Sequence, residues 1–374
     1  MQFKNVIGQG EIKTRLISSI KEGRVSHAHL FLGNDGSGNL ALALAYSQYL
    51  LCKNPSETDS CGKCPSCLKV EKLQHPDLHF SYPFFSKQSG GSVSDEFLVE
   101  WRESVLKSTY FDLNYWRNAL TAENKQLLIT TKEATNILHK LKLKSFEGNY
   151  KFVIIWRPEV MRTEAANKLL KIIEEPPEKT IFILVAESQE NIIQTILSRT
   201  QITKIPTIDD QDFIDALLAK YPDVKNDEAE SLMHYHNKNF FNACQFLEGG
   251  NEMNLYHSLF SDWMRKCYMS DTAGLMKFSD EMHKSGREKI KQFLDYSLNM
   301  VRQCLVGNYT NGELMRLSQA EMAFANKFAQ FINDRNIEGI FKEINQAHAD
   351  ISRNIYGKLV LFDLSIKMMK LIKA

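Results

Sequence analysis

The sequence predicts an α/β fold in which helices cover a parallel sheet, followed by an all-α region. In the first half of the chain, short apolar runs alternate with stretches of helical periodicity, as they do in parallel sheets. After about residue 206 the strand patterns stop and helical patterns continue to the end. A chain of 374 residues, 43% of them hydrophobic, can form two or three domains with buried cores.

The elements of the first half follow one another in alternation. Strands are expected at 28–32, 127–130, 152–156 and 181–186. Helices are expected at 40–51, 132–143 and 164–174. In the last of these helices Thr163 is the candidate N-cap, and Pro176 with Pro177 ends the helix.

Residues 81–126 interrupt this alternation. A Ser- and Gly-rich stretch at 86–94 precedes a stretch with many aromatic side chains. These are Trp101, Tyr110, Phe111, Tyr115 and Trp116. We interpret the whole segment as an insertion on the sheet domain.

Helices alone are expected from residue 206 onward. Residues 206–250 form a small helical unit that ends at Gly249 and Gly250, and residues 251–374 form a second helical region. Two helices there have apolar faces suited to core packing or to subunit contacts. The first face comprises Ile290, Phe293, Leu294, Val301 and Cys304. The second, in the last helix, comprises Ile355, Leu359, Phe362, Ile366 and Met369.

The charge balance gives no global signal for nucleic acid. Lys and Arg number 46 against 45 Asp and Glu, a net charge of +1, so any contact with DNA needs a local patch or a partner chain. The sequence contains neither an unbroken apolar run of about 18 residues nor an apolar N-terminal signal region. We therefore expect a soluble, cytoplasmic protein with reduced cysteines.

A glycine-rich loop follows the first expected strand and opens the next helix. Its sequence, at residues 33–40, is Gly-Asn-Asp-Gly-Ser-Gly-Asn-Leu. Gly33, Gly36 and Gly38 are spaced as in a phosphate loop, in which backbone N–H groups and a helix N-terminus bind phosphate. Asn39 stands where such a loop has Lys, and Leu40 stands where it has Ser or Thr.

These replacements remove the groups that ATP hydrolysis needs. Asn39 cannot neutralise the β- and γ-phosphates, and Leu40 cannot bind magnesium. The later strand runs into Trp156 and Arg157 instead of the acidic pair that orders magnesium and activates water. We expect a degenerate phosphate loop with weak or no nucleotide binding and no turnover. The alternative is a glycine-rich turn unrelated to nucleotides.

Four of the seven cysteines form a cluster typical of a metal site. Cys52, Cys61, Cys64 and Cys67 have the spacing of a knuckle that surrounds one zinc ion with four thiolates. Four protein ligands leave no open position, so the zinc is expected to be structural. Four free core cysteines or two disulfides are the alternatives.

Several segments in a fixed order resemble the AAA+ clamp loaders of bacteria. They are the approach to the loop at 25–33, the four-cysteine knuckle, residues 147–151 and 165–171, the Glu-Glu-Pro-Pro sequence at 174–177, and the Ser-Arg-Thr sequence at 198–200. The resemblance is close over about residues 5–80 and 125–205 and loose in the helical remainder. It is greatest to the delta-prime type of DNA polymerase III subunit, whose nucleotide loop is typically degenerate.

The resemblance implies a RecA-like AAA+ domain at 1–205, a helical lid at 206–250 and a helical collar at 251–374. It implies a non-hydrolysing stator subunit, in a ring with gamma/tau ATPase subunits and a delta subunit. Such a ring opens the sliding clamp and places it on primed DNA. Arg199, with Ser198 beside it, is then the residue that acts in trans on a neighbour's ATP, because a guanidinium is always charged and can bond phosphate oxygens.

Three features depart from the family pattern. The triplet ends in Thr200 where the family usually has Cys, the insertion at 81–126 is long, and 239–242 lacks the arginine of ATP-using relatives. Two other functions are compatible with the sequence. One is a gamma/tau-type ATPase, which the missing phosphate-loop groups oppose. The other is a zinc-containing DNA-binding scaffold, which the balanced charge opposes.

Overall fold

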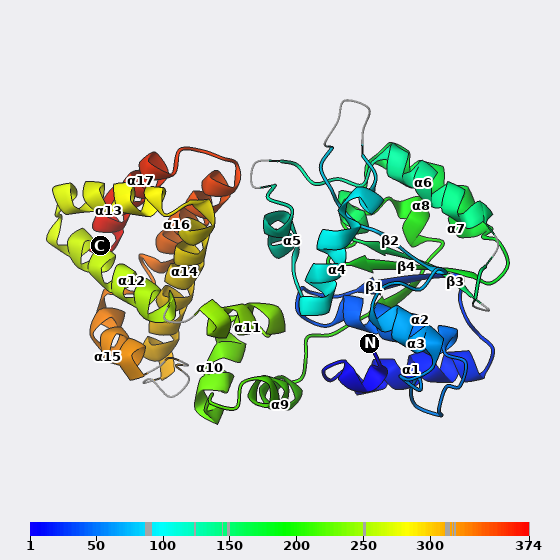
Figure 1. Cartoon of the computed structure of the whole chain (residues 1–374). Coiled ribbons are helices and arrows are strands. Elements are labelled where there is room, and N and C mark those ends of the chain that lie inside the picture. The colour runs from blue at the N-terminus through cyan, green and yellow to red at the C-terminus, as the bar shows by residue number, and fades with distance from the viewer. Residues whose placement is uncertain are drawn as a thin grey trace. The chain divides into compact units, whose positions relative to one another are not determined.

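The chain divides into two compact units, Met1–Cys244 and Gln245–Ala374, which are described separately (Figure 1). The structure is a computed structural model that describes residues 1–86, 92–122, 125–143, 145–147, 150–249, 252–310 and 319–373, together with Met315 and Leu317. The first unit contains a sheet with its covering helices. The described part of the second unit is helical.

A five-stranded parallel sheet forms the centre of the first unit. Its strands are β1 (Ala28–Leu32), β2 (Leu78–Ser81), β3 (Lys151–Trp156), β4 (Thr180–Ala186) and β5 (Gln201–Lys204), in the spatial order β2-β3-β4-β1-β5. In β1, Leu30 pairs with Leu184 of β4, and Leu32 pairs with Lys204 of β5. Strands β3 and β4 are buried along their whole length, as expected of apolar parallel strands covered on both faces.

Helices cover both faces of this sheet (Figure 1). On one face lie α6 (Thr131–Lys142), α7 (Thr163–Glu174) and α8 (Gln194–Leu197), whose apolar side chains share one core cluster with β1, β3 and β4. On the other face lie α1 (Gly10–Lys21), α2 (Asn39–Leu51) and α3 (Pro65–Glu71). Helix α2 contacts the sheet, α1 and α3, and it is therefore buried along nearly its whole length.

The segment between β2 and α6 carries the 3-10 helix η2 (Ser94–Phe97) and the helices α4 (Leu98–Lys107) and α5 (Leu113–Ala119). Its aromatic side chains form a core of their own. Trp101 stacks on Tyr82 with ring centroids 4.2 Å apart and meets Trp116 edge-on at 5.4 Å. Trp101 also packs against Trp156 at the end of β3, which joins the segment to the sheet.

Three helices follow β5. They are α9 (Asp210–Lys220), α10 (Asn226–Tyr235) and α11 (Phe240–Gly249), and the division between the two units falls inside α11. Helix α9 packs on α10. Phe213 of α9 meets Phe240 of α11 edge-on with centroids 5.4 Å apart, so the start of α11 is held by the first unit.

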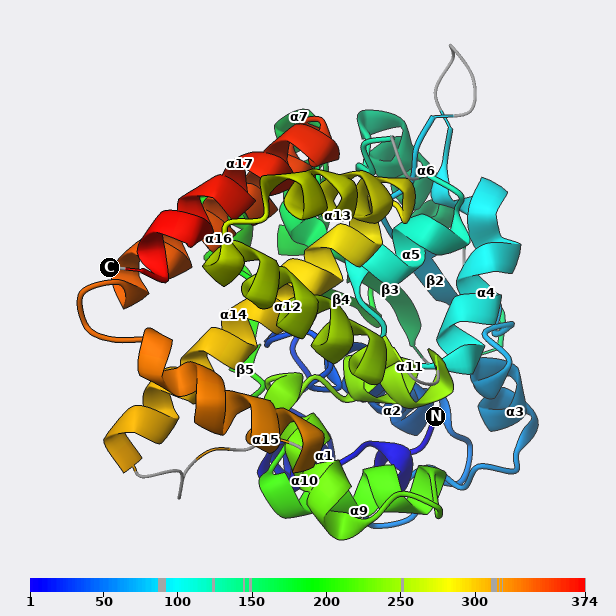
Figure 2. The same ribbon diagram turned by 90° about the vertical axis from the view of Figure 1, so that its left-hand side faces the viewer.

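The second unit consists of packed helices in its described part. They are α12 (Glu252–Met269), α13 (Thr272–Lys284), α14 (Arg287–Thr310), α15 (Gln319–Phe328), α16 (Ile337–Ser352) and α17 (Gly357–Leu371). Short 3-10 helices are η1 (Phe3–Asn5) and η3 (Pro158–Val160) in the first unit and η4 (Ala329–Phe331) in the second. Figure 2 shows α16 and α17 side by side, and α17 also packs on α13. Trp263 of α12 stacks on Phe278 of α13 and donates its indole N–H to Ser365 of α17 at 2.8 Å.

Most elements expected in the first half are confirmed within a residue or two, namely β1, β3, β4, α2, α6 and α7. The sequence did not predict β2 and β5, which are four-residue edge strands with mixed polar and apolar residues. The strand expected at 127–130 is wrong. Leu128 and Ile129 there make only isolated bridges, to Phe84 and Met161.

Two finer expectations about helices are also wrong. Thr163 is the first residue of α7 and not its cap, and Arg162 at the N-cap position makes no side-chain cap hydrogen bond. The apolar face expected on α17 is exposed in part, since Leu359 is 65% exposed. The buried face consists of Gly357, Val360, Leu361, Leu364, Ser365 and Met368. Helix α17 is apolar on two adjacent faces, and periodicity alone cannot choose between them.

The apolar face expected on α14 is confirmed, because all five of its predicted residues are fully buried. The domain boundaries near residues 205 and 250 stay predictions. Residues 250 and 251 lie outside the described residues, as do 87–91 of the Ser- and Gly-rich stretch and Gly148 with Asn149 of the 147–151 motif. Within the described parts of the chain, every helix is too short or too polar to cross a membrane.

Candidate functional site

The glycine-rich loop lies at the carboxyl edge of the parallel sheet, where ligands of α/β proteins usually bind. Strand β1 ends at Leu32, and α2 begins at Asn39. Gly36 and Gly38 have φ angles of +78° and +92°. Residues with a side chain rarely adopt positive φ angles, so the two glycines allow the backbone to take the curved shape of a phosphate loop. The expected strand–loop–helix context is therefore present.

Asn39 folds back into the structure instead of facing a ligand. Its side-chain amide donates hydrogen bonds to the carbonyls of Gly33 and Ala186, the latter at 3.5 Å. Asn39 is 9% exposed and its neighbour Leu40 is 3% exposed. At the position of the phosphate-loop lysine, the chain thus carries a neutral amide, which connects the start of α2 by hydrogen bonds to the ends of β1 and β4.

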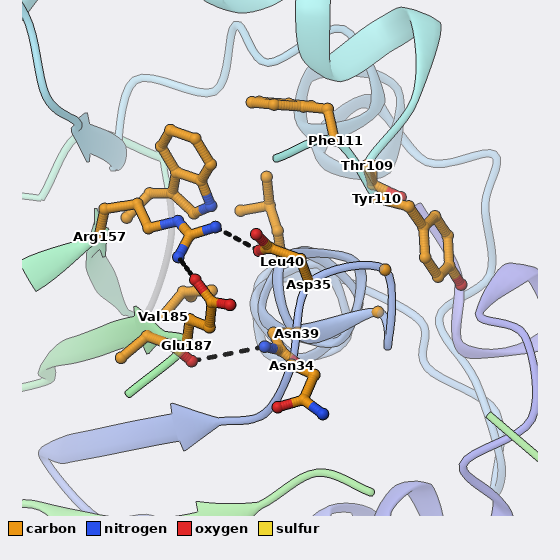
Figure 3. Close-up of a pocket in the computed structure, with 14 residues that line it drawn as sticks. Asn34, Asp35, Asn39, Leu40, Thr109, Tyr110, Phe111, Arg157, Val185 and Glu187 are labelled. Atoms are coloured by element: carbon orange, nitrogen blue, oxygen red, sulfur yellow. Dashed lines mark hydrogen bonds and ion pairs between the residues drawn. The ribbon is translucent and has the colours of Figure 1, made fainter. Parts of the chain in front are cut away.

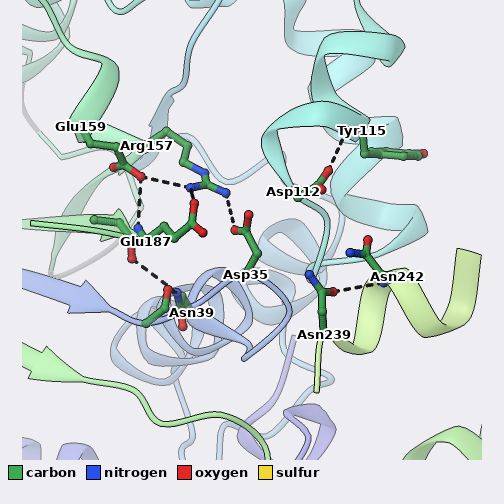
Figure 4. A network of polar contacts seen from close by, with 11 residues as sticks. Asp35, Asn39, Asp112, Tyr115, Arg157, Glu159, Glu187, Asn239 and Asn242 are labelled. Carbon is green, nitrogen blue, oxygen red and sulfur yellow. Dashed lines mark hydrogen bonds and ion pairs between the residues drawn. The ribbon is translucent and has the colours of Figure 1, made fainter. Parts of the chain in front are cut away.

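Arg157 occupies the region beside the loop where the acidic pair of an ATPase would stand (Figure 3). It directly follows β3 in a left-handed conformation with φ of 62°, and it is only 4% exposed. Its guanidinium pairs with Asp35 of the loop, with Glu159 at 3.1 Å and with Glu187 at 2.5 Å. Figure 4 shows that these carboxylates converge on one guanidinium from the loop, η3 and the end of β4. The guanidinium is therefore engaged within the chain.

The pKa values of this cluster reflect burial and pairing. Burial alone would lower the pKa of Arg157, but Asp35 and then Glu159 raise it above its ordinary value, so the guanidinium stays charged. Burial raises the pKa of Asp35 to about 6, against the opposing effect of Arg157. Burial also raises the pKa of Asp112, which lies near the loop and accepts a hydrogen bond from the backbone N–H of Tyr115 at 2.7 Å.

Neighbouring segments touch the glycines of the loop closely. A Cβ atom on Gly38 would lie 3.1 Å from the ring of Tyr110, a residue of the aromatic segment. A Cβ atom on Gly36 would lie 2.7 Å from the Cα of Asn239, which directly precedes α11. On Gly33 a Cβ atom would collide with the backbone carbonyl after β5. Other segments of the chain therefore pack tightly against the glycines of this loop.

The remaining cavity is small and carries net negative charge. Its volume is about 290 Å³, including space open to solvent, which is near the lower limit for a small-molecule site. Two carboxylates, of Asp35 and Glu187, line it against the single guanidinium of Arg157. A nucleoside triphosphate is strongly anionic, so this lining is unfavourable for its binding. Asn39 and Leu40 stand where a phosphate loop that transfers phosphoryl groups has its lysine and its magnesium ligand.

Arg199 lies far from this loop. It precedes β5, whose first residue Gln201 pairs with His29 of β1, whereas Gly33 follows the last residue of β1. Four residues of strand separate His29 from Gly33, a distance of roughly 13 Å, and Arg199 lies beyond the opposite edge. Arg199 therefore cannot serve the loop of its own chain.

The contacts of Arg199 are local. Its Nε donates to the carboxylate of Glu174 at 2.8 Å, and its Nη1 donates to the carbonyl of Thr195 at 3.0 Å. Ser198 donates its hydroxyl to the same carbonyl at 3.2 Å and lies 3.5 Å from Nη1. The side chain of Arg199 is 31% exposed, so its guanidinium is held at the surface of the first unit.

The cysteine cluster forms the second candidate site. Cys52 follows α2, Cys64 caps α3 and Cys67 lies within α3, so the knuckle joins the two helices. The four Sγ atoms, including that of Cys61, lie within 4.8 Å of one another. Successive backbone N–H groups point at the sulfurs, with Cys61 donating to Cys52 and Cys64 donating to Cys61, each at 3.3 Å. Such N–H···S bonds stabilise thiolates that hold a metal.

The spacing of the sulfurs suits a tetrahedral ion. Zinc–sulfur bonds of about 2.3 Å place tetrahedral sulfurs about 3.8 Å apart, and the Sγ atoms of Cys61 and Cys67 lie 3.9 Å apart. All four cysteines are free in this structure, which favours a metal site over two disulfides. Backbone N–H groups of Lys63 and Cys64 lower the pKa of the Cys61 thiol to about 6. The four cysteines could therefore hold a metal ion.

Sequence reasoning identified the loop, the knuckle and Arg199, but it missed the groups that close the loop. It noted Arg157 only as the absence of an acidic pair. It noted Tyr110 only as part of an aromatic stretch and Asn239 only as an uncharged position. The pattern of apolar residues held no signal for these contacts, because they join segments that are distant in sequence.

The fold and the loop together define the class of the protein. A parallel sheet of order β2-β3-β4-β1-β5, a phosphate-type loop between β1 and α2, and helices after the last strand characterise an AAA+-type P-loop protein. The model of the family described as DNA polymerase III, delta subunit, matches residues 8–209, more than half of the chain. The chain belongs to this family of clamp-loader proteins.

Individual relatives are similar over the same region. The delta' subunit of DNA polymerase III from Bacillus subtilis is 28% identical over 193 residues, which are 52% of this chain and 46% of that protein. A tau/gamma subunit from Haemophilus influenzae is 26% identical over 197 residues, 53% of this chain and 22% of that protein. The matched segment thus spans less than half of either relative. A solved structure of a gamma-subunit-related protein from Thermotoga maritima aligns over 96% of this chain and 99% of its own, with 14% identity and a TM-score of 0.42.

Proposed function

We propose that this chain is the non-hydrolysing stator subunit of a replicative clamp loader, of the delta' type. In this role it assembles with gamma/tau ATPase subunits and a delta subunit, and the ring opens the sliding clamp and loads it on primed DNA. The chain then has three parts: a sheet domain at 1–205, a helical lid at 206–250 and a helical collar at 251–374 that mediates assembly.

The closed phosphate loop is the observation that carries the proposal. The buried guanidinium of Arg157, paired with three carboxylates, lies where an ATPase would have its magnesium-ordering acids. Asn39 replaces the lysine, and Tyr110 packs over Gly38. A subunit with this site contributes structure and contacts to an ATP-driven ring, but no turnover of its own.

A gamma/tau-type ATPase is the second candidate, because tau and gamma subunits are among the similar proteins. The same loop opposes it. A turnover assay on the isolated chain separates the two candidates: steady ATP hydrolysis that co-purifies with the protein and disappears in the loop variant Gly38→Val would favour the ATPase. Absence of hydrolysis under conditions in which a gamma/tau subunit is active would favour the stator.

The four-cysteine cluster is proposed to hold structural zinc. Four thiolates satisfy a tetrahedral ion completely and leave no position for a substrate or water. The ion would fix the turn between α2 and α3, on the face of the sheet opposite α7. Its contribution is folding energy for the knuckle, since the cluster lies between two helix ends.

The stator contributes to catalysis through Arg199, with Ser198 beside it, acting on the ATP of a neighbouring subunit. Two observations support this assignment. Arg199 lies at the opposite edge of the sheet from its own loop, and its guanidinium is held at the surface. A cation supplied in trans stabilises charge on the transferring phosphoryl group, and its removal can cost about 10³-fold or more at the site it serves.

Reconstitution with the gamma/tau and delta subunits of the same organism tests this function. Arg199→Ala should leave the assembled complex intact while it lowers DNA- and clamp-stimulated ATP hydrolysis and clamp loading. If the other ATP sites hydrolyse independently, the rate of the whole complex falls by less than the rate at the single site that Arg199 serves. Arg24→Ala, which removes another surface arginine with one ion-pair partner, is the matched control. Full activity of an intact Arg199→Ala complex would contradict the catalytic contribution.

A further inference from the structure

Glu174 holds the side chain of Arg199 in place. The two residues are 25 positions apart, at the end of α7 and after α8, yet the carboxylate of Glu174 accepts a hydrogen bond from Nε of Arg199 at 2.8 Å. Together with the bond from Nη1 to the Thr195 carbonyl at 3.0 Å, this contact fixes two of the three nitrogens of the guanidinium. We propose that Glu174 is a positioning residue that presents the remaining Nη2 of Arg199 to a neighbour's ATP, an inference that rests on the proposed function.

The position of Glu174 is not explained by the stability of its helix. The carboxyl end of a helix carries partial negative charge, so a carboxylate in the last turn of α7 is unfavourable there. The pair is also exposed, with the side chain of Glu174 at 52% and that of Arg199 at 31%, and exposed ion pairs add little to stability. A carboxylate at this place is better explained by what it does to the arginine.

Orientation matters for an arginine that acts across an interface. A long side chain without fixed contacts samples many rotamers, and it loses this conformational entropy when the transition state forms. A guanidinium already fixed at Nε and Nη1 meets the phosphoryl group with less loss of entropy. The orientation of the planar guanidinium, and with it the direction of Nη2, is then set by Glu174 of α7 and by Thr195 of α8.

The alternative is that Glu174 and Arg199 form only a surface pair, while Arg199 caps the short helix α8 through the Thr195 carbonyl. The two accounts differ in what removal of Glu174 does to catalysis. If Glu174 acts through Arg199, its removal lowers kcat at the site served by Arg199. Its removal should then have no further effect once Arg199 is gone. If the pair is only a surface contact, kcat should not change.

The experiment compares Glu174→Ala, Glu174→Gln and Glu175→Ala in the reconstituted complex. Glu175 is the matched control, because it is the next carboxylate along the chain and is also exposed. Glu174→Ala should lower the clamp- and DNA-stimulated kcat by about tenfold with little change in KM for ATP, as expected for lost orientation. Glu174→Gln keeps an oxygen that can accept from Nε and should retain much of the rate. Glu175→Ala should be unchanged.

The double variant Glu174→Ala with Arg199→Ala decides how the effect arises. We expect it to match Arg199→Ala alone, because a positioning residue cannot act without the group that it positions. Unchanged kcat in Glu174→Ala, while Arg199→Ala is impaired, would overturn the inference and leave the proposed function standing. Unchanged activity in Arg199→Ala itself would instead remove the proposed action of Arg199 in trans, and with it the role of Glu174. Circular dichroism and assembly by native mass measurement confirm that each variant is folded and incorporated.

Discussion

Replacement of Arg157 by Met should destabilise the first unit strongly, although no ligand is lost. The substitution removes a guanidinium that is 4% exposed and leaves Asp35, Glu159 and Glu187 without their common partner. Breaking a buried ion pair from one side costs about 3–5 kcal/mol, because an uncompensated charge stays behind. The side chain of Glu187 is 48% exposed and recovers water, so we place the cost for Arg157→Met near 3 kcal/mol.

The measurement is the unfolding free energy from urea titration, or the melting temperature. For a unit of this size, about 3 kcal/mol corresponds to a fall in Tm of about 6–12 °C. Arg24→Met, at an exposed arginine, should shift the free energy by less than about 0.5 kcal/mol. In the double variant Arg157→Met with Asp35→Asn, much of the loss should be recovered, because the substitution removes one of the carboxylates left unpaired.

Two results would refute this reasoning. A loss of unfolding free energy below about 1 kcal/mol for Arg157→Met would mean that the ion pairs of Arg157 are solvated and contribute little to stability. A double variant as unstable as the sum of the two single variants would mean that the loss arises from packing of the arginine stem and not from unpaired charge.

The remaining predictions concern the knuckle, the buried imidazole of β1 and the loop backbone. Cys64→Ser should lower the bound zinc from near one ion per chain and destabilise the turn between α2 and α3. Elemental analysis measures the first effect and thermal melts the second. A zinc content below about 0.2 per chain in the unaltered protein, purified without chelator, would contradict the site. His29 is buried and its pKa is lowered by that burial to about 4, whereas the unfolded chain titrates near pH 6.5. The neutral imidazole of His29 therefore stabilises the folded state fully above pH 6.5, and this stabilisation is lost as the pH falls toward 4. Between pH 7 and 4.5 the unfolding free energy of His29→Gln should consequently fall by about 2–3 kcal/mol less than that of the unaltered protein. Gly36→Ala should cost more than about 2 kcal/mol, because the added Cβ would meet Asn239 and φ is positive. Gly10→Ala, at an open site with ordinary φ, should be neutral or slightly stabilising, and equal effects at both glycines would contradict the tight packing of the loop.

The sequence predicted the parts of the fold that depend on local pattern. Strands β3 and β4 are continuous apolar runs, and α7 is amphipathic, so their positions follow from periodicity. Strands β2 and β5 are short, polar in part and located at the sheet edges, so they carry little local signal. The exposed Leu359 shows the same limit, because burial on α17 depends on which helices surround it.

The candidate site was predictable where chemistry depends on residue type and spacing. The four cysteines and the missing lysine at Asn39 could be recognised from the sequence alone. The network of Arg157 could not, because its partner Asp35 lies 122 positions away and the pairing exists only in the folded chain. The hydrogen bond between Glu174 and Arg199 could not be predicted for the same reason, although both residues lie in motifs that are recognisable from the sequence.

If the chain is the proposed stator, its loop also makes a return to nucleotide hydrolysis difficult during evolution. Asn39→Lys, the single change that restores the missing lysine, would place a second cation in a cavity that already holds Arg157. It would also remove the amide that ties α2 to the carbonyls of Gly33 and Ala186. Restoring a working site would require Arg157, Leu40 and the segment around Tyr110 to change together, and each intermediate would be less stable than its parent. In the proposed stator, the packing around the loop would therefore oppose the recovery of ATP turnover.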